Sequence, residues 1–126
     1  MRNIIALCMI IALVLGISAA WWFFSPDRYG EQIAPNQSVP LIEILQNPDP
    51  FLEKPITIEG VVSRQCAATG CFFFFAIGDR SLRVELSDIA PTFPQRKGYR
   101  AIVTGTLRRH NEALVFYGRG VEFSRR

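Results

Sequence analysis

Residues 55–77 read PITIEGVVSRQCAATGCFFFFAI, and this stretch decides the fold. Apolar and polar residues alternate from Ile56 to Gln65, a two-residue period that indicates a strand, with Gly60 as a kink or bulge. The aromatic run Cys71–Ile77 indicates a second strand. Because only residues 67–70 separate the two runs, the stretch predicts a β-hairpin.

The sequence on either side of the hairpin predicts three more strands and one helix. Leu82–Leu86 alternates cleanly, and strands at Tyr99–Leu107 and Ala113–Phe123 follow a loop at residues 89–98 that contains two prolines. Residues 38–47 predict a short helix that precedes all five strands.

This order of elements sets the expected fold class, which is mainly β. Ser38 is the expected N-cap of the helix, and Leu41, Ile44 and Leu45 share one of its faces. Hairpins join all consecutive strands except the third and fourth, which have a longer link. The order predicts a five-stranded, OB-fold-like Greek-key barrel with the short helix closing one end. A small SH3-like barrel is the alternative.

The N-terminal residues predict a transmembrane helix. Residues 4–24 carry no charge, and as a helix they would span about 32 Å, close to the hydrocarbon thickness of a bilayer. Trp21 and Trp22 suit the interfacial aromatic belt. A signal peptide cleaved near Ala20 is the alternative, but the apolar run continues to Phe24, which favours a retained anchor. The expected segments are an anchor at 1–24, a polar stalk linker at 25–37 and the OB-fold-like domain at 38–126.

The charges beside the apolar run predict its orientation. Arg2 and the α-amino group precede it, whereas Asp27, Arg28 and Glu31 roughly cancel after it. The positive-inside rule then gives a single-pass protein of the inner (cytoplasmic) membrane with its C-terminal domain in the periplasm. A cleaved signal peptide would export the domain to the same side. The expected partners are the membrane and another membrane protein or complex, with no nucleic acid.

The charge of the remaining chain is unevenly distributed. Residues 25–95 hold five basic and nine acidic side chains, whereas residues 96–126 hold eight basic and two acidic ones. The basic tail is interpreted either as a solvated face or as a patch that contacts anionic lipid headgroups or an acidic partner. Arg108, Arg109 and Arg119 are its candidate contact residues.

Cys66 and Cys71 flank the hairpin turn and are the main candidates for chemistry. If the hairpin closes at residues 67–70, the two cysteines face each other at a distance that a disulfide accepts, and an oxidising compartment favours a structural disulfide. A redox-active pair and a copper(I) site of two thiolates stay open as alternatives. A larger metal site is not expected, because Cys8 lies in the apolar segment and His110 is the sole histidine.

The hairpin also carries a resemblance. Its strand ends in Glu59-Gly-Val-Val62 and is followed by Cys66-Ala-Ala-Thr-Gly-Cys71-Phe. This pattern resembles a family of exported bacterial OB-fold proteins, and the resemblance covers residues 38–123. It implies a fold and a compartment but no activity. The architecture resembles, more weakly, the membrane-anchored haem chaperone of cytochrome c maturation. That family needs a tyrosine four residues after its histidine, and here Leu114 follows His110 at that spacing.

Four consecutive phenylalanines, residues 72–75, place two aromatic rings on each face of their strand. Phe72 and Phe74 form the candidate outward face, while the other pair fills the core. An outward aromatic face of an OB domain is a surface for a ligand or partner. Coverage by the short helix or by the loop at 89–98 is the alternative.

Enzymatic chemistry has no support in the sequence. The acidic residues lack paired spacing, and neither a glycine-rich phosphate loop nor a nucleophile elbow is present. We therefore expect a non-catalytic, membrane-anchored periplasmic binding or adaptor module, accessory to a membrane complex and without a cofactor. A thiol redox or copper-handling protein acting through Cys66 and Cys71 is the alternative, and haem delivery is the most remote one.

Overall fold

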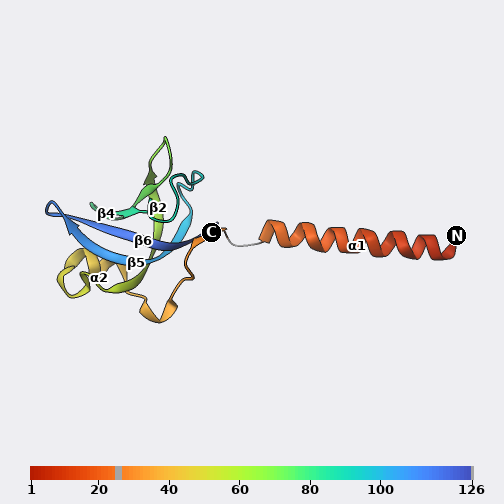
Figure 1. Ribbon diagram of the computed structural model, residues 1–126, viewed down its shortest axis with the longest axis horizontal. Helices are drawn as coiled ribbons and strands as arrows, with labels where there is room; N and C mark the ends of the chain where they lie inside the picture. Colours follow the sequence, from red (N-terminus) through yellow and green to blue (C-terminus); the bar gives the residue numbers. More distant parts are fainter. Residues whose placement is uncertain (25–26, 126) are drawn as a thin grey trace.

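The computed structural model describes residues 1–24 and 27–125, which form one long helix and a mainly β domain (Figure 1). The helices are α1 (Arg2–Phe24), α2 (Leu41–Gln46) and the short 3-10 helices η1 (Pro35–Gln37) and η2 (Asp49–Phe51). The strands are β1 (Asp27–Gly30), β2 (Pro55–Gln65), β3 (Phe72–Ile77), β4 (Arg80–Glu85), β5 (Arg100–His110) and β6 (Ala113–Ser124).

Helix α1 projects away from the β domain (Figure 1), and residues 1–23 are exposed along its whole length. At 1.5 Å per residue its 23 residues give a length of about 35 Å, enough to cross a bilayer. Exposed Ile, Leu and Val side chains cover all sides of the helix, as a lipid-facing helix requires. The helix is consistent with a signal anchor or a signal sequence.

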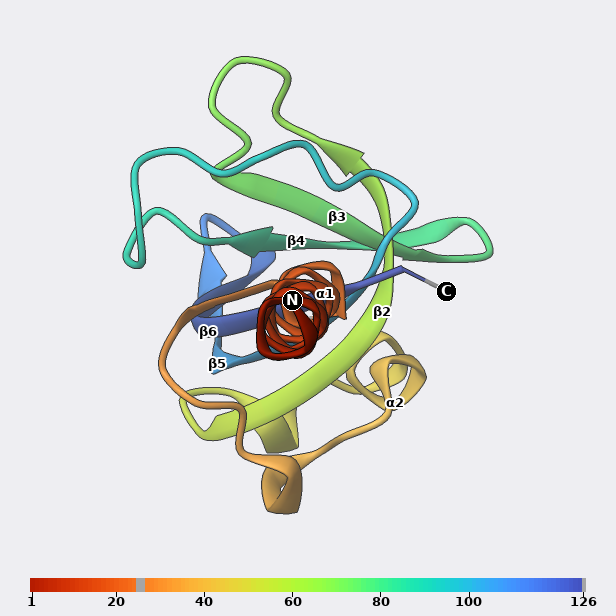
Figure 2. The same cartoon turned by 90° about the vertical axis from the view of Figure 1, so that its right-hand side faces the viewer.

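The six strands form one sheet, and five of them curve into a near-closed ring (Figure 2). The ring order is β2-β3-β4-β6-β5, and β5 pairs again with β2. The β4–β6 pairing is parallel and the other pairings are antiparallel. The structure therefore confirms the expected mainly β domain with a ring of five strands, which follows a long N-terminal apolar helix in the chain.

The centre of the ring is filled by side chains that alternate along the strands. Phe73 and Phe75 of β3 are fully buried, with ring centres 5.1 Å apart, and Phe73 also packs on Phe123 of β6. Ile44 of α2 closes the core and is fully buried. The sequence pattern therefore assigned the two faces of the phenylalanine run correctly.

Residues 27–37 of the segment expected as a stalk are instead packed against the ring. Strand β1 pairs with β6, with Asp27 opposite Phe123. Further along, the buried Thr57 hydroxyl donates to the Ala34 carbonyl (2.7 Å) and lies 2.8 Å from the Thr104 hydroxyl, while the Ala34 amide donates to Thr104 (3.0 Å). The stalk prediction is wrong for these residues, and residues 25 and 26 of the predicted stalk lie outside the described residues. The sequence did not reveal the attachment, because the partners lie far away in the chain and leave no local pattern.

Two smaller expectations also need correction. Helix α2 begins at Leu41 with Pro40 as its N-cap residue and no side-chain cap, so Ser38 is not the cap; Ser38 instead forms a bridge with Thr57. In β2 the irregularity lies between Val62 and Arg64 rather than at Gly60. Gly60 makes room for a core ring, because an added Cβ there would lie 2.8 Å from Phe75.

Candidate functional site

The turn between β2 and β3 has a different register from the one that the spacing predicts. Gln65 pairs with Phe73, and the Cys66 amide donates a hydrogen bond to the Phe72 carbonyl (3.0 Å). Cys66 therefore lies opposite Phe72, and Cys71 belongs to the turn.

The expected structural disulfide is absent, since Cys66 and Cys71 are both free thiols. The prediction assumed that the two cysteines form the last cross-strand pair. The Gly70 amide instead closes the turn on the Cys66 carbonyl (3.0 Å), and the Cys71 carbonyl accepts the Leu86 amide (2.7 Å). The main chain of Cys71 is thus bonded to the end of β4 and not across to Cys66.

A single hydroxyl group lies between the two sulfur atoms. Thr69 Oγ1 donates to Cys71 Sγ over 3.0 Å and lies 3.6 Å from Cys66 Sγ. The hydroxyl has one proton, so it donates to one sulfur at a time and accepts from an S–H on the other side. Rotation of one side chain can therefore favour the negative charge on either sulfur.

The turn also changes the acidity of Cys66. Hydrogen bonding from the Thr69 amide, the Thr69 hydroxyl and the Ala68 amide lowers the pKa of Cys66 from its ordinary value of 9.0 to about 7, against a smaller opposing effect of burial. Hydrogen bonds favour the charged form of an acid whenever they point at the thiolate. Near neutral pH a large share of Cys66 is therefore thiolate, the nucleophilic form.

The loop between β4 and β5 locks the turn in this shape. The Phe93 amide donates to the Thr69 carbonyl (2.7 Å), and Gln95 Nε2 donates to the Cys66 carbonyl (2.9 Å). Gln65 Nε2 donates to the carbonyls of Gly70 and Pro94, both at 3.0 Å. The geometry around the sulfurs is thus held by hydrogen bonds from both sides and does not depend on a covalent link.

Phe72 and Phe74 lie on the outer face of β3, as expected, and are half-buried. Their rings meet edge to face with centres 6.1 Å apart. The Arg83 guanidinium carbon lies 4.0 Å from the Phe72 ring centre, and that of Arg64 lies 4.7 Å from the Phe74 ring centre. Arginine side chains, rather than α2 or the loop, therefore cover this aromatic face.

The face continues across the neighbouring strands. Glu85 of β4 lies opposite Phe72, and Tyr117 of β6 lies opposite Glu85. Arg83 donates to Glu85 with Nη2 at 2.9 Å and Nε at 3.3 Å. The Arg108 guanidinium carbon, 5.6 Å from the Tyr117 ring centre, borders the same surface.

The other two arginines of the predicted contact set are not part of this surface. Arg109 pairs with Asp49 (3.0 Å) and Arg119 with Glu31 (3.8 Å), and Arg108 itself also pairs with Glu53 (3.3 Å). All three are exposed. The structure therefore joins Arg108 to Phe72 and Phe74 through Tyr117 and leaves Arg109 and Arg119 outside.

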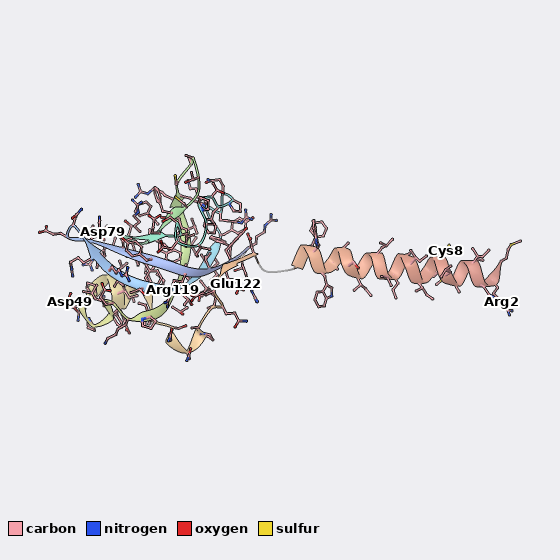
Figure 3. All side chains as sticks on the ribbon, viewed as in Figure 1. Arg2, Cys8, Asp49, Asp79, Arg119 and Glu122 are labelled. Atoms are coloured by element: carbon pink, nitrogen blue, oxygen red, sulfur yellow. The ribbon has the colours of Figure 1, made fainter. Side chains whose placement is uncertain are left out.

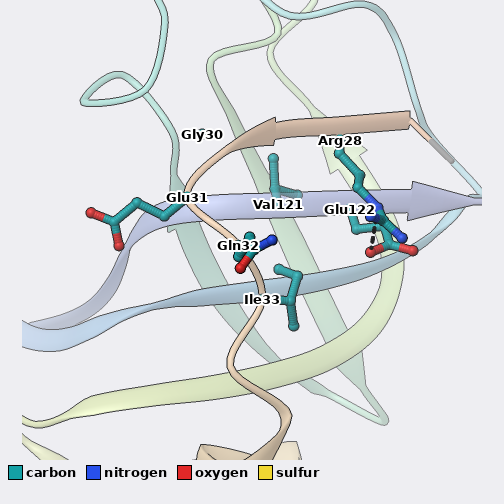
Figure 4. A pocket seen from close by; sticks show the side chains of 7 residues that line it. All are labelled: Arg28, Gly30, Glu31, Gln32, Ile33, Val121 and Glu122. Atoms are coloured by element: carbon teal, nitrogen blue, oxygen red, sulfur yellow. Dashed lines mark ion pairs between the residues drawn. The ribbon is translucent and has the colours of Figure 1, made fainter.

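The remaining candidates lie apart from the turn. His110 is exposed at the end of β5, and Figure 3 shows Cys8 near the free end of α1, far from the β domain. Among the described residues no three His, Cys, Asp or Glu side chains gather as metal ligands. A groove of about 340 Å³ at the β1–β6 edge is shown in Figure 4, where Arg28 pairs with Glu122 (3.1 Å).

Sequence comparison adds no assignment to this geometry. No protein-family model and no curated protein matches the chain.

The sequence reasoning missed the groups that act around the cysteines. Thr69 lies between the two cysteines, and its hydroxyl could have been recognised from the sequence as a hydrogen-bonding group close to both sulfurs. Gln65, Phe93 and Gln95 could not be found in the same way, because their bonds join the end of β2 and the turn to a loop that lies far along the chain. Arg64 and Arg83 become neighbours of the phenylalanines only once the strand register is known.

Proposed function

We propose that the chain is a non-catalytic, membrane-anchored binding module of the OB type, displayed in the periplasm as an accessory part of a membrane complex. The ring order with one parallel pair, β4–β6, supports the Greek-key assignment. In OB domains the outer face of the second and third ring strands, together with the turn before them, is the common binding surface. Here those strands are β3 and β4, and the turn holds Cys66 and Cys71.

The observation that carries this proposal is the pair of half-buried rings, Phe72 and Phe74, on that face. Aromatic side chains on a sheet exterior bind well when they become fully buried, since each ring removes a large apolar area from water. Arg64 and Arg83 cover the rings by contacts worth about 0.5–1 kcal/mol each at an exposed site, so a partner can replace them.

The charges of the face indicate an acidic partner. Arg83 is held by Glu85, whereas Arg64 forms no ion pair within residues 1–24 and 27–125. Arg108 at the border is paired with Glu53, so Arg64 is the main positive charge of the face. An acidic segment with apolar side chains fits this surface, because its carboxylates meet the guanidinium groups while its apolar groups cover the rings.

The short connection to α1 favours a partner in the same membrane. Strand β1 starts only three residues after the last residue of α1, a span of at most about 11 Å. If α1 spans the bilayer, the β domain is confined to the membrane surface, where the effective concentration of another membrane protein is high. The aromatic face with its positive charge and the short connection to α1 together support an adaptor role.

Copurification after mild detergent extraction tests the proposal. We expect the full chain to elute with a membrane-protein partner and the double variant Phe72→Ser, Phe74→Ser to elute alone. Ile42→Ser is the matched control, because Ile42 is also exposed (41%) but lies on α2. The proposal is wrong if the chain always elutes alone, or if the double variant retains the partner as well as the control does.

The mass of the chain purified from membranes tests the anchor separately. A retained anchor predicts a protein that still contains residues 1–24 and needs detergent to leave the membrane. A soluble product that begins after Ala20 would show instead that α1 is a cleaved signal sequence.

A further inference from the structure

We infer that Cys66 and Cys71 form a redox-active dithiol that exchanges electrons with disulfides, with Cys66 as the attacking thiol and Cys71 as the resolving thiol. The inference goes beyond the proposed binding role and does not rest on it. It stands on three features of the turn. The first is the cradle around Cys66, which consists of the Ala68 and Thr69 amides and the Thr69 hydroxyl. The others are the position of that hydroxyl between the two sulfurs and the hydrogen bonds that hold the turn in its reduced form.

The cradle makes the two thiols unequal. Amide groups of the turn favour the Cys66 thiolate, and the Thr69 hydroxyl adds to this effect when it turns to that sulfur. In the dithiol the Thr69 hydroxyl donates to Cys71 Sγ (3.0 Å) and lies 3.6 Å from Cys66 Sγ, so the two sulfurs lie on either side of one hydroxyl, whereas the amides act on Cys66 alone. A dithiol reaction needs this asymmetry, because one sulfur attacks while the other waits as a thiol.

The exchange balances with a disulfide RSSR, such as oxidised glutathione, as the oxidant. The Cys66 thiolate attacks one sulfur of RSSR, which forms a mixed disulfide and releases one thiolate. Cys71 then loses its proton to solvent and attacks the Cys66 sulfur, which closes the Cys66–Cys71 bond and releases the second thiolate. Two electrons pass from the protein to RSSR, and the Thr69 hydroxyl can turn from Cys66 to Cys71 as the charge moves.

The reduced turn is already rigid, which separates this pair from a structural disulfide. Carbonyls of Cys66, Thr69, Gly70 and Cys71 all accept hydrogen bonds at 2.7–3.0 Å from Gln95, Phe93, Gln65 and Leu86. Opening the covalent bond therefore leaves the hairpin in place, so the pair can cycle without unfolding the domain. A copper(I) site is less well supported, because two converging thiolates are needed and the turn activates one sulfur.

The test uses the full chain in detergent micelles with Cys8→Ala as the background. Oxidised glutathione should convert both thiols of this protein to an intramolecular disulfide without a glutathione adduct, and reduced glutathione should reopen it. With Cys71→Ser the reaction should stop at a stable adduct on Cys66. Alkylation of Cys66 in that variant should show a midpoint near pH 7.

Thr69 provides the matched pair of variants. Thr69→Val removes the hydroxyl at almost constant shape and should move the alkylation midpoint of Cys66 to higher pH, whereas Thr69→Ser should keep it. The inference is overturned by a midpoint in the ordinary thiol range, by separate glutathione adducts on both cysteines, or by a disulfide that reduced glutathione does not open. Copper(I) bound by both sulfurs in a chain that forms no disulfide would overturn it in favour of a metal site.

Discussion

Gly70→Ala measures how tightly the cysteine turn is packed against the loop that locks it. Gly70 has a φ of 70°, and a Cβ added there would lie 2.4 Å from the Phe93 carbonyl oxygen and 2.9 Å from Gln65 Nε2. Gly78 offers the matched control, since its φ is 60° but nothing lies within 4 Å of an added Cβ. The two substitutions therefore share the backbone strain and differ in the clash.

The expected magnitudes follow from these contacts. A left-handed residue other than glycine costs about 1–2 kcal/mol, which is the whole expected cost of Gly78→Ala. In Gly70→Ala the loop must also move, and the bonds from Phe93 to Thr69 and from Gln65 to Gly70 are lost at about 1 kcal/mol each. Gly70→Ala should thus lower the free energy of unfolding by about 3–4 kcal/mol.

Urea unfolding of the full chain in micelles measures the difference. Tryptophan fluorescence would report on α1, because both tryptophans, Trp21 and Trp22, lie there. The near-ultraviolet circular dichroism of the packed tyrosine and phenylalanine side chains is therefore the suitable signal for the β domain. With an m-value of about 2 kcal/mol/M, the midpoint of Gly70→Ala should fall about 1 M below that of Gly78→Ala. Equal midpoints would show that the loop does not lock the turn in the way the contacts indicate.

Two further predictions concern single groups. The pKa of Cys66 is about 7 in the fold against an ordinary 9.0, so the thiolate contributes stability that is complete above pH 9 and is lost as the pH falls through 7. As the pH rises from 7 to 9, the reduced chain should therefore gain stability relative to Cys66→Ser, and urea midpoints measured across this range test the gain. A difference between the two midpoints that does not change with pH would contradict the lowered pKa. Thr57→Val should cost about 1–3 kcal/mol, because the Ala34 carbonyl and the Thr104 hydroxyl lose their shared partner, and Thr57→Ser should cost less. Faster proteolysis between residues 27 and 40 in the valine variant would report release of the segment, and an unchanged rate in both variants would argue against its attachment.

The strands of the ring were predictable because their packing imposes a local pattern. One side of each strand faces the core, so the two-residue period survives in the sequence and even assigns Phe73 and Phe75 to the interior. The predicted ends of the strands lie within three residues of the observed ones, and the largest difference arises where hydrogen bonds continue beyond the apolar positions. Strand β5, for example, reaches His110 although its apolar alternation ends at Leu107.

The site was harder to predict, because one residue of register changes every neighbour. Pairing Cys66 with Cys71 requires that the turn contain only residues 67–70. The structure pairs Cys66 with Phe72, and this choice is set by Gly70 and by contacts with the loop around Phe93. Strand β1 illustrates the same limit, since Asp27-Arg-Tyr-Gly30 has no strand pattern of its own and is a strand only beside β6.

The uneven charge along the chain has an intramolecular explanation. Strands β5 and β6 lie beside β2 and β1, so basic residues of the second half meet acidic residues of the first half. Five ion pairs have this form: Arg96–Asp27, Arg100–Glu59, Arg108–Glu53, Arg109–Asp49 and Arg119–Glu31. These pairs neutralise much of the basic tail, and exposed pairs add only about 0–1 kcal/mol each to stability. The charge offered to a partner is therefore set less by the tail than by Arg64 on the aromatic face, because Arg83 there is itself paired with Glu85.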